Sequence, residues 1–190
     1  LTKAFLAQYA RDRRFPQDAA LYSNGSVSVY GTLPATGEHS LTQCLSEWLR
    51  GARPQDYIAV LSFLPRTAGL DRAVQTLRQT FARTLSSATT VGFGPRYLHS
   101  TGQLYKGGPD AAIFLELTAE DPADLPIPGE PFTFGVLKQA QALGDFQAMR
   151  QRGRRILRVH LRDEIMSAGI HEFLAGTRHY TLHAGRSFAI

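Results

Sequence analysis

A group of polar and glycine residues near the middle of the chain has the composition of a ligand-binding segment. It combines basic side chains, hydroxyl and amide donors and glycines, and the candidate ligand-binding residues are Arg96, Ser100, Thr101, Gly102, Gln103, Lys106, Gly107 and Gly108. Glycines let backbone N–H groups approach an anion. Arginine supplies a fork of donors and lysine a point charge. We therefore predict a surface loop that suits a phosphate or a sugar phosphate.

His99 is the candidate catalytic residue of this loop, because histidine can act as a general acid or base near neutral pH. No acidic residue adjoins it in sequence, and Asp110 is the nearest one downstream. The alternative is a structural loop, with glycines at turns and Arg96 paired to a buried acid such as Glu116. The spacing of glycine and lysine does not match a nucleotide-binding P-loop.

The rest of the chain has no pattern typical of a metal or cofactor site. His179 and His183 are four residues apart, but no carboxylate completes a metal-binding spacing on a helix face. The single Cys44 excludes an internal disulfide and a cysteine-based metal cluster, and it fits a reducing cytoplasm. We expect no metal, no cofactor and a cytoplasmic location.

The formal net charge of +5 favours anionic partners only weakly, since arginines are spread along the chain. The densest group, between Arg150 and Arg158, straddles a predicted helix end, where cations stabilise the helix dipole. There is no array of aromatic residues of the kind that stacks on nucleic-acid bases. No apolar run approaches the roughly 20 residues that a membrane helix needs. We expect neither a nucleic-acid nor a membrane partner.

Hydrophobic periodicity predicts alternating strands and helices around the polar group. The predicted strands are 26–30, 57–64, 89–93, 111–117 and 156–161, and the predicted helices are 1–14, 41–51, 68–86 and 133–152. This order predicts an α/β fold, a three-layer α/β/α arrangement with a mostly parallel central sheet of about five strands. The candidate loop follows Phe93, at a strand carboxyl end, where such sheets bind ligands.

The domain organisation predicted is a single α/β domain over residues 1–162, followed by a C-terminal helix and tail over 163–190. The short helix is expected at 163–175. Because the sequence does not begin with methionine, we expect it to be a fragment of something longer or a processed product.

Two long stretches resemble a known family. VGFGPRYLHSTGQLYKGGPDAAIFLEL (91–117) and DLPIPGEPFTFGVLKQAQALGDFQAMRQRGRRILRVHL (124–161) are similar to the C-terminal region of bifunctional transaldolase/glucose-6-phosphate isomerases. That family joins a transaldolase barrel, which forms a Schiff base on lysine, to two sugar-isomerase modules. The lysine, the modules and the family's Gln…Lys motif are not in this sequence, so its catalytic residues are not carried over.

The resemblance implies a C-terminal domain that packs on the isomerase modules and contributes its loop to a sugar-phosphate site, without being catalytic alone. The partners implied are a sugar phosphate and the isomerase and transaldolase domains of the parent chain, with a homo-oligomer as a further alternative. Two other hypotheses stay open. One is a structural or oligomerisation domain without a ligand site of its own. The other is a small independent enzyme using His99, which requires a carboxylate and a pocket beside it.

Overall fold

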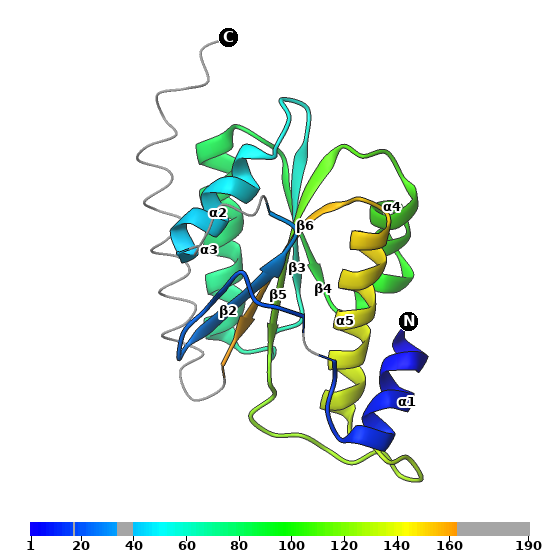
Figure 1. The fold of residues 1–190 in the computed structure, drawn as a ribbon. Coiled ribbons are helices and arrows are strands. Elements are labelled where there is room, and N and C mark those ends of the chain that lie inside the picture. The colour runs from blue at the N-terminus through cyan, green and yellow to red at the C-terminus, as the bar shows by residue number, and fades with distance from the viewer. Residues whose placement is uncertain (17, 34–39, 163–190) are drawn as a thin grey trace.

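The strands form one sheet with helices on both faces, as shown by a computed structural model that describes residues 1–16, 18–33 and 40–162 (Figure 1). In chain order, the elements are α1 (Thr2–Asp12), β1 (Tyr22–Ser23), β2 (Val27–Gly31), α2 (Leu41–Arg50), β3 (Tyr57–Ser62), α3 (Ala68–Leu85), β4 (Thr89–Phe93), the 3₁₀ helix η1 (Arg96–His99), α4 (Thr101–Gly107), β5 (Ala112–Ala119), α5 (Phe134–Gln151) and β6 (Arg155–Leu161). The predicted α/β class and the three layers are confirmed.

The sheet has the strand order β1-β2-β6-β5-β3-β4. Strands β3 to β6 are parallel, and the hairpin β1–β2 adds to β6 in antiparallel orientation. The described sheet thus contains one strand beyond the five predicted. The extra strand exists because the Asn24 side-chain oxygen accepts hydrogen bonds from the amides of Ser26 and Val27, at 2.9 and 2.7 Å. This turn lets the two-residue β1 pair with β2.

Local capping explains where three of the helices begin. Ser40 and Gln43 form a reciprocal capping box at α2. Thr67 and Thr133 accept hydrogen bonds from the backbone amides at the first turns of α3 and α5. These hydrogen bonds satisfy amide groups that have no partner within the helix.

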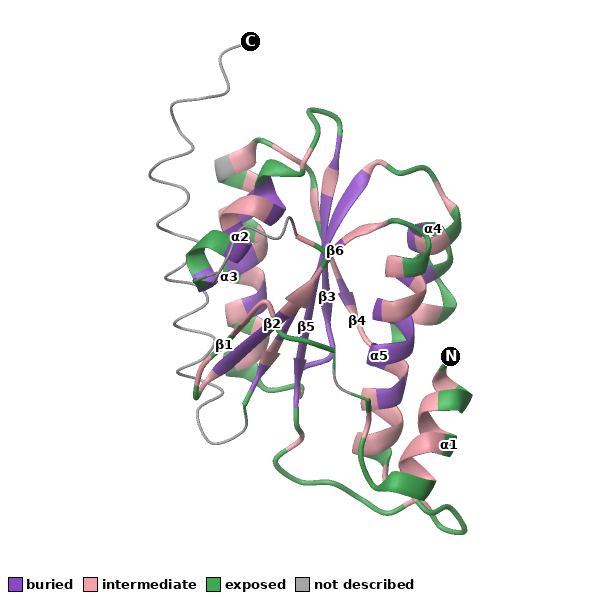
Figure 2. Cartoon of the chain, in the orientation of Figure 1, coloured by how far each residue is buried: buried purple, intermediate pink, exposed green. Residues whose placement is uncertain are grey.

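The two faces of the sheet bury different side chains (Figure 2). Helices α2 and α3 cover one face, where the buried cluster is mainly aliphatic and includes Val29, Leu77 and Leu157. The other face lies under α4 and α5 and buries an aromatic cluster around Phe114 and Phe146. Polar residues of the strands are buried on this second face as well, so it is where chemistry can be sought.

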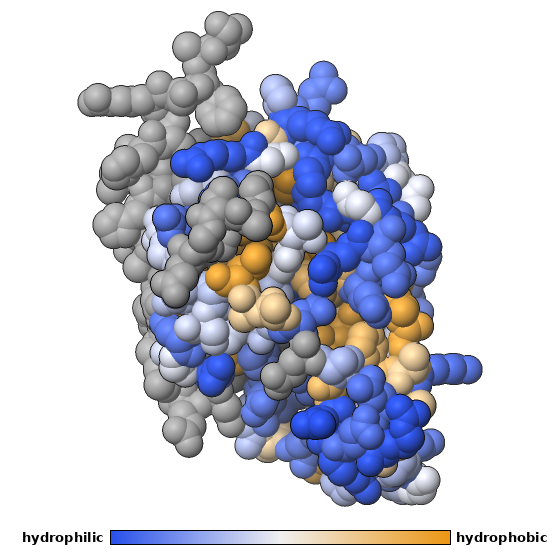
Figure 3. All heavy atoms as spheres, viewed as in Figure 1, coloured by the Kyte–Doolittle hydropathy of each residue, from blue (hydrophilic) through white to orange (hydrophobic). Residues whose placement is uncertain are grey.

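Helix α1 packs on α5 through a close approach at Gly144 (Figure 1). A Cβ atom at this position would lie 2.9 Å from the Thr2 hydroxyl, so glycine is required by packing although it weakens a helix interior. No residue of α1 is fully buried. In Figure 3, hydrophobic residues reach the surface over α1 and α5.

One secondary-structure prediction is wrong. The polar stretch after β4, expected as a loop, contains η1 and α4. Tyr97 and Tyr105 anchor these turns in the aromatic cluster, and that packing outweighs the low helix propensity of Gly102 and Gly107. The predicted helix at 163–175 lies outside the described residues.

Candidate functional site

The candidate residues lie on the crossover from β4 to β5, here called the central segment (Arg96–Gly108). It starts at the carboxyl end of β4, where the amide of Gly94 bonds the Ser62 carbonyl at 2.8 Å. It ends at the amino edge of the sheet, where Arg154, just before β6, donates to the carbonyls of Lys106 and Gly108. Its first half therefore lies at the ligand-binding edge of an α/β sheet, and its second half leads away from that edge.

The outward side of the central segment carries most of the predicted ligand-binding residues. Its exposed members are Leu104 and the predicted site residues Arg96, His99, Ser100, Thr101, Gln103 and Gly107. The Gln103 amide donates to the Leu98 carbonyl at 3.2 Å. The Arg96 guanidinium and the His99 ring form no hydrogen bond or ion pair with any residue that the structure describes. The carboxylate that catalysis by His99 alone requires is therefore not found within the described ranges.

The inward side of the segment is bonded to α5 through Asp145. This carboxylate accepts a hydrogen bond from the Tyr97 hydroxyl at 2.6 Å and forms an ion pair with Lys106. Its side chain is 3% exposed, and that of Lys106 is 17% exposed. Burial, followed by the charge of Asp145, raises the pKa of Tyr97 well above its ordinary value, so the hydroxyl keeps the proton that it donates. The predicted ligand-binding Lys106 thus directs its charge into the domain.

The remaining glycines of the segment have packing roles. Gly102 is buried, and a Cβ atom there would lie 2.9 Å from the Tyr97 carbonyl oxygen. The Gly108 amide closes α4 by bonding the Leu104 carbonyl at 2.7 Å. The structure therefore places Gly102 and Gly108 against the segment's own backbone rather than on its exposed side.

Glu116 lies at the centre of the sheet and is fully buried. The expected pairing of Arg96 with Glu116 is not formed, since neither oxygen of this carboxyl has a hydrogen-bond partner in the described part of the chain and Arg96 is exposed. Burial, and then the charge of Asp145, raises the pKa of Glu116 well above its ordinary range. Its neighbour in the sheet register is Arg158 of β6, whose guanidinium lies 4.2 Å from the centre of the Tyr30 ring.

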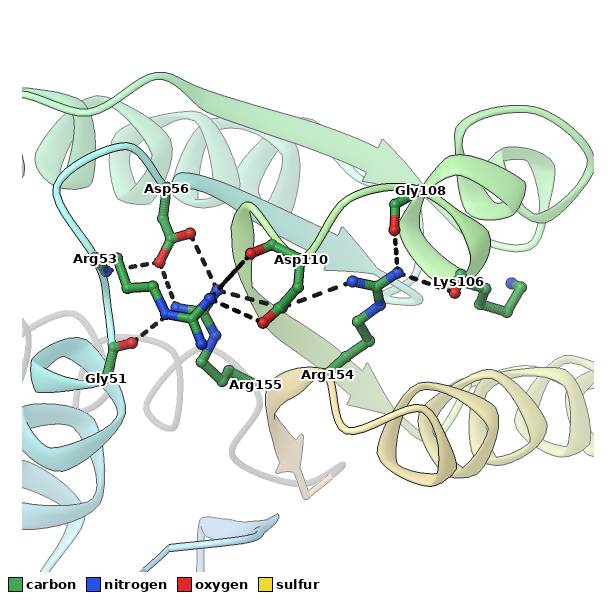
Figure 4. Close-up of polar contacts among 8 residues, drawn as sticks. All are labelled: Gly51, Arg53, Asp56, Lys106, Gly108, Asp110, Arg154 and Arg155. Carbon is green, nitrogen blue, oxygen red and sulfur yellow. Dashed lines mark hydrogen bonds and ion pairs between the residues drawn. The ribbon is translucent and has the colours of Figure 1, made fainter.

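A second polar network holds the amino edge of the sheet together (Figure 4). Arg155 donates to the Asp56 carboxylate, to the Gly51 carbonyl at 2.8 Å and to Asp110 at 3.3 Å. Arg53 also pairs with Asp110, at 3.0 Å. Burial alone would raise the pKa values of both carboxyls, but the hydrogen bonds and charges of the arginines keep these pKa values below the ordinary range. This network joins α2, β3, β5 and β6, and we assign it a structural role.

Asp145 and Tyr97 were missed as site residues by sequence reasoning. Asp145 lies four residues before Met149, which places it on the inner face of the predicted helix, where a carboxylate needs partners. A carboxylate on the apolar face of a helix was therefore a signal by which Asp145 could have been found from the sequence. Tyr97 offered none beyond its place beside Arg96.

No group of three or more metal-ligating side chains is found within residues 1–16, 18–33 and 40–162. In the same part of the chain, no helix has the length and apolar character needed to span a membrane. Cys44 is buried on the inner face of α2, and burial followed by the charge of Glu47 raises its pKa to about 11, so the thiol is unreactive.

Comparison with known proteins supports the fold and leaves the activity open. No protein family and no curated protein matches the sequence. Among solved structures, the hypothetical protein TT0462 from Thermus thermophilus is similar, with a TM-score of 0.65 and 17% sequence identity. The match covers 76% of this chain and 40% of that one, so the chain corresponds to under half of that structure. At this identity the likeness shows a shared fold alone.

Proposed function

We propose that the chain is the C-terminal α/β domain of a transaldolase/glucose-6-phosphate isomerase, acting in sugar-phosphate metabolism in the cytoplasm. The observation that carries the proposal is that the two stretches resembling that family meet in one buried network. Tyr97 and Lys106 belong to the first stretch, and Asp145, to which both are bonded, belongs to the second. Residues from two separate stretches of the sequence are thus bonded to one another in the fold.

The two sides of the central segment then have different roles. The inward side fixes α4 and η1 on α5 through Asp145. The outward side, with Arg96, His99 and Gln103, is free to line or cover a sugar-phosphate site that the isomerase modules or a neighbouring subunit complete. In this proposal the domain contributes binding residues and is not catalytic alone.

Steady-state kinetics test this role. The chain by itself is expected to give no turnover of glucose 6-phosphate. Added to a transaldolase/glucose-6-phosphate isomerase truncated before the region that resembles Thr89–Leu161, it is expected to restore isomerase activity, and Arg96→Ala is expected to weaken that rescue. Robust turnover by the chain alone, or no rescue by the folded wild-type chain, would overturn the proposal.

A structural or oligomerisation domain is the second candidate function. It is favoured by the observation that Lys106 and the Gly108 carbonyl are already satisfied within the chain. Sedimentation velocity separates the two candidates when it is combined with the rescue assay on wild type and Arg96→Ala. A stable oligomer whose rescue of the truncated enzyme is unchanged by Arg96→Ala would favour the structural role.

A further inference from the structure

A pocket of about 580 Å³ lies between α1, α5 and the sheet, on the face opposite α2 and α3. This volume is within the range of small-molecule sites. Its walls come from the end of α1 and the residues after it, from β2 and β6, and from the first half of α5. The charged side chains lining it are Arg13, Arg14, Arg158, Arg162 and Glu120. None of them belongs to the central segment.

The pocket is strongly cationic. Four arginines face one glutamate, which leaves a net charge of +3 from these five side chains. His160 also lines the pocket, but burial and the charges of Arg158 and Arg162 lower its pKa to about 4, so it is neutral near pH 7. No carboxylate of a described residue lies within 4 Å of the four arginine side chains.

Arg158 is the buried member of this group. It is 7% exposed, and its guanidinium lies 4.2 Å from the centre of the Tyr30 ring and 5.0 Å from that of Phe146. Its Nε has no hydrogen-bond partner among the described residues. A buried cation without an acceptor is costly. Its neighbour Glu116 forms no hydrogen bond with it. Burial, followed by the charge of Asp145, raises the pKa of that carboxyl well above its ordinary value, which disfavours the charged form that could offset Arg158. An anion in the pocket would supply the acceptor.

After Glu116, the acid whose charge acts on Arg158 is Asp18, and Asp18 is already paired. The charge of Asp18 acts on Arg158, but its carboxylate is bonded to Arg150 at 2.9 Å. The stacking of Arg158 on Tyr30 and Phe146 holds the guanidinium plane in place without using its N–H groups. Those groups therefore remain available for a planar, two-point contact with an oxyanion.

The other arginines reach the pocket from two further directions. Arg13 ends α1 in the left-handed conformation, with φ of 52°, and donates to the Pro131 carbonyl at 2.7 Å. The chain turns there, so that Arg14 lines the pocket beside it. Arg162 follows β6, and its contacts with the hydroxyls of Ser23 and Ser28 are long and neutral, at 3.3 and 3.4 Å. Donors from α1 and from β6 thus converge on one space.

We propose that this arginine pocket binds a small phosphate monoester, with the phosphate held by Arg14, Arg158 and Arg162. Phosphate fits better than a carboxylate because it is a dianion with three terminal oxygens, which matches several arginine forks and a net charge of +3. The pocket is larger than phosphate alone requires, and the organic part of the ester lies against Tyr30 and Gln139. The proposal goes beyond the family assignment and stands without it, because it uses other residues.

Calorimetric titration of the whole chain with glucose 6-phosphate tests the pocket, with inorganic phosphate and glucose as comparison probes. We expect saturable binding of glucose 6-phosphate, weaker binding of inorganic phosphate and no binding of glucose. The double variant Arg14→Gln/Arg162→Gln changes two exposed side chains, so the core is untouched, and it is expected to raise the Kd at least tenfold. Arg72→Gln, an exposed arginine on α3 across the sheet, is the matched control and is expected to stay within twofold.

The outcomes separate this site from the central segment. Absence of saturable binding to the wild type, or equal binding of glucose and glucose 6-phosphate, would overturn the pocket. So would a double variant that binds like the wild type. Loss of binding in Arg96→Ala but not in the double variant would also overturn it and would place the ligand on the central segment. Failure of the isomerase rescue with retained binding would overturn the family assignment alone.

Discussion

Replacing Asp145 with alanine is expected to destabilise the domain strongly, because one carboxylate joins three elements. Asp145 of α5 accepts from the Tyr97 hydroxyl of η1 and pairs with the Lys106 ammonium of α4. Alanine removes both acceptors at once. The Tyr97 hydroxyl, which is buried, and the ammonium, which is mostly buried, are then left without them.

The magnitude follows from these two contacts. A hydrogen bond to a charged group contributes about 1.5–3 kcal/mol. The lower part of that range applies to Lys106, because its side chain is 17% exposed and water reaches it. Together the losses amount to about 3–5 kcal/mol, the cost typical of removing one partner of a buried ion pair. For a chain of this length, that lowers the Tm by about 6–20 °C.

Urea unfolding, followed by the fluorescence of the single tryptophan, Trp48, measures the effect. Asp145→Asn keeps an acceptor for Tyr97 but removes the charge opposite Lys106, and it is expected to be intermediate. Tyr97→Phe in the wild type and in Asp145→Ala closes a double-mutant cycle with a coupling of about 1 kcal/mol or more. Asp18→Ala, which removes an exposed ion pair with Arg150, is the control and is expected to cost under about 1 kcal/mol. An Asp145→Ala stability within about 1 kcal/mol of the wild type would refute the reasoning.

Three further perturbations follow from buried groups. The pKa of Glu116 in the folded state is raised above its ordinary value, so stability is lost as pH rises from about 4.5 toward that pKa. In urea unfolding, Glu116→Gln is expected to be as stable as the wild type near pH 4 and more stable at pH 8. Equal pH profiles of the two proteins would contradict this. The pKa of His160 is lowered from 6.5 to about 4, so its contribution to the free energy of unfolding is present above pH 6.5 and is lost as pH falls to 4. His160→Asn is expected to remove about 3 kcal/mol of this acid sensitivity. An unchanged slope of unfolding free energy against pH would argue against a neutral buried ring. Gly94→Ala would press a Cβ atom into the buried Phe63 ring and is expected to lower the Tm by several degrees, whereas Gly25→Ala, where a Cβ atom meets nothing within 4 Å, serves as the thermal-melt control.

The strands and long helices could be predicted because their signals are local. The apolar runs of β3 and β5 and the three-and-four spacing in α3 depend on short stretches of sequence. The hydroxyl caps at Ser40 and Thr67 are equally local. The short helix α4 could not be predicted, because its glycines oppose helix formation and its stability comes from Tyr105 packing on Phe114, at a ring separation of 5.3 Å.

The candidate site was predicted only in part, for a related reason. Polar residues close in sequence were visible as a group, but the sequence did not indicate that Lys106 turns inward to Asp145. The arginine pocket joins Arg14 of the segment after α1 to Arg158 of β6, and no sequence spacing links them. Fold class constrains which strand ends meet, whereas the direction of each side chain depends on packing partners from distant elements.

The position of β6 between β2 and β5 has a consequence for how the chain is made. Val29 of the first hairpin pairs with Val159, so this hairpin meets its neighbour only after nearly the whole domain has left the ribosome. Until then one edge of β5 and one edge of β2 are open, and these two strands present unpaired backbone groups to other nascent chains. The described sheet is therefore most open to wrong pairing just before β6 emerges. A translation pause that holds Arg155–Leu161 inside the ribosome would prolong that interval, whereas a pause after this strand has emerged would leave the sheet able to close.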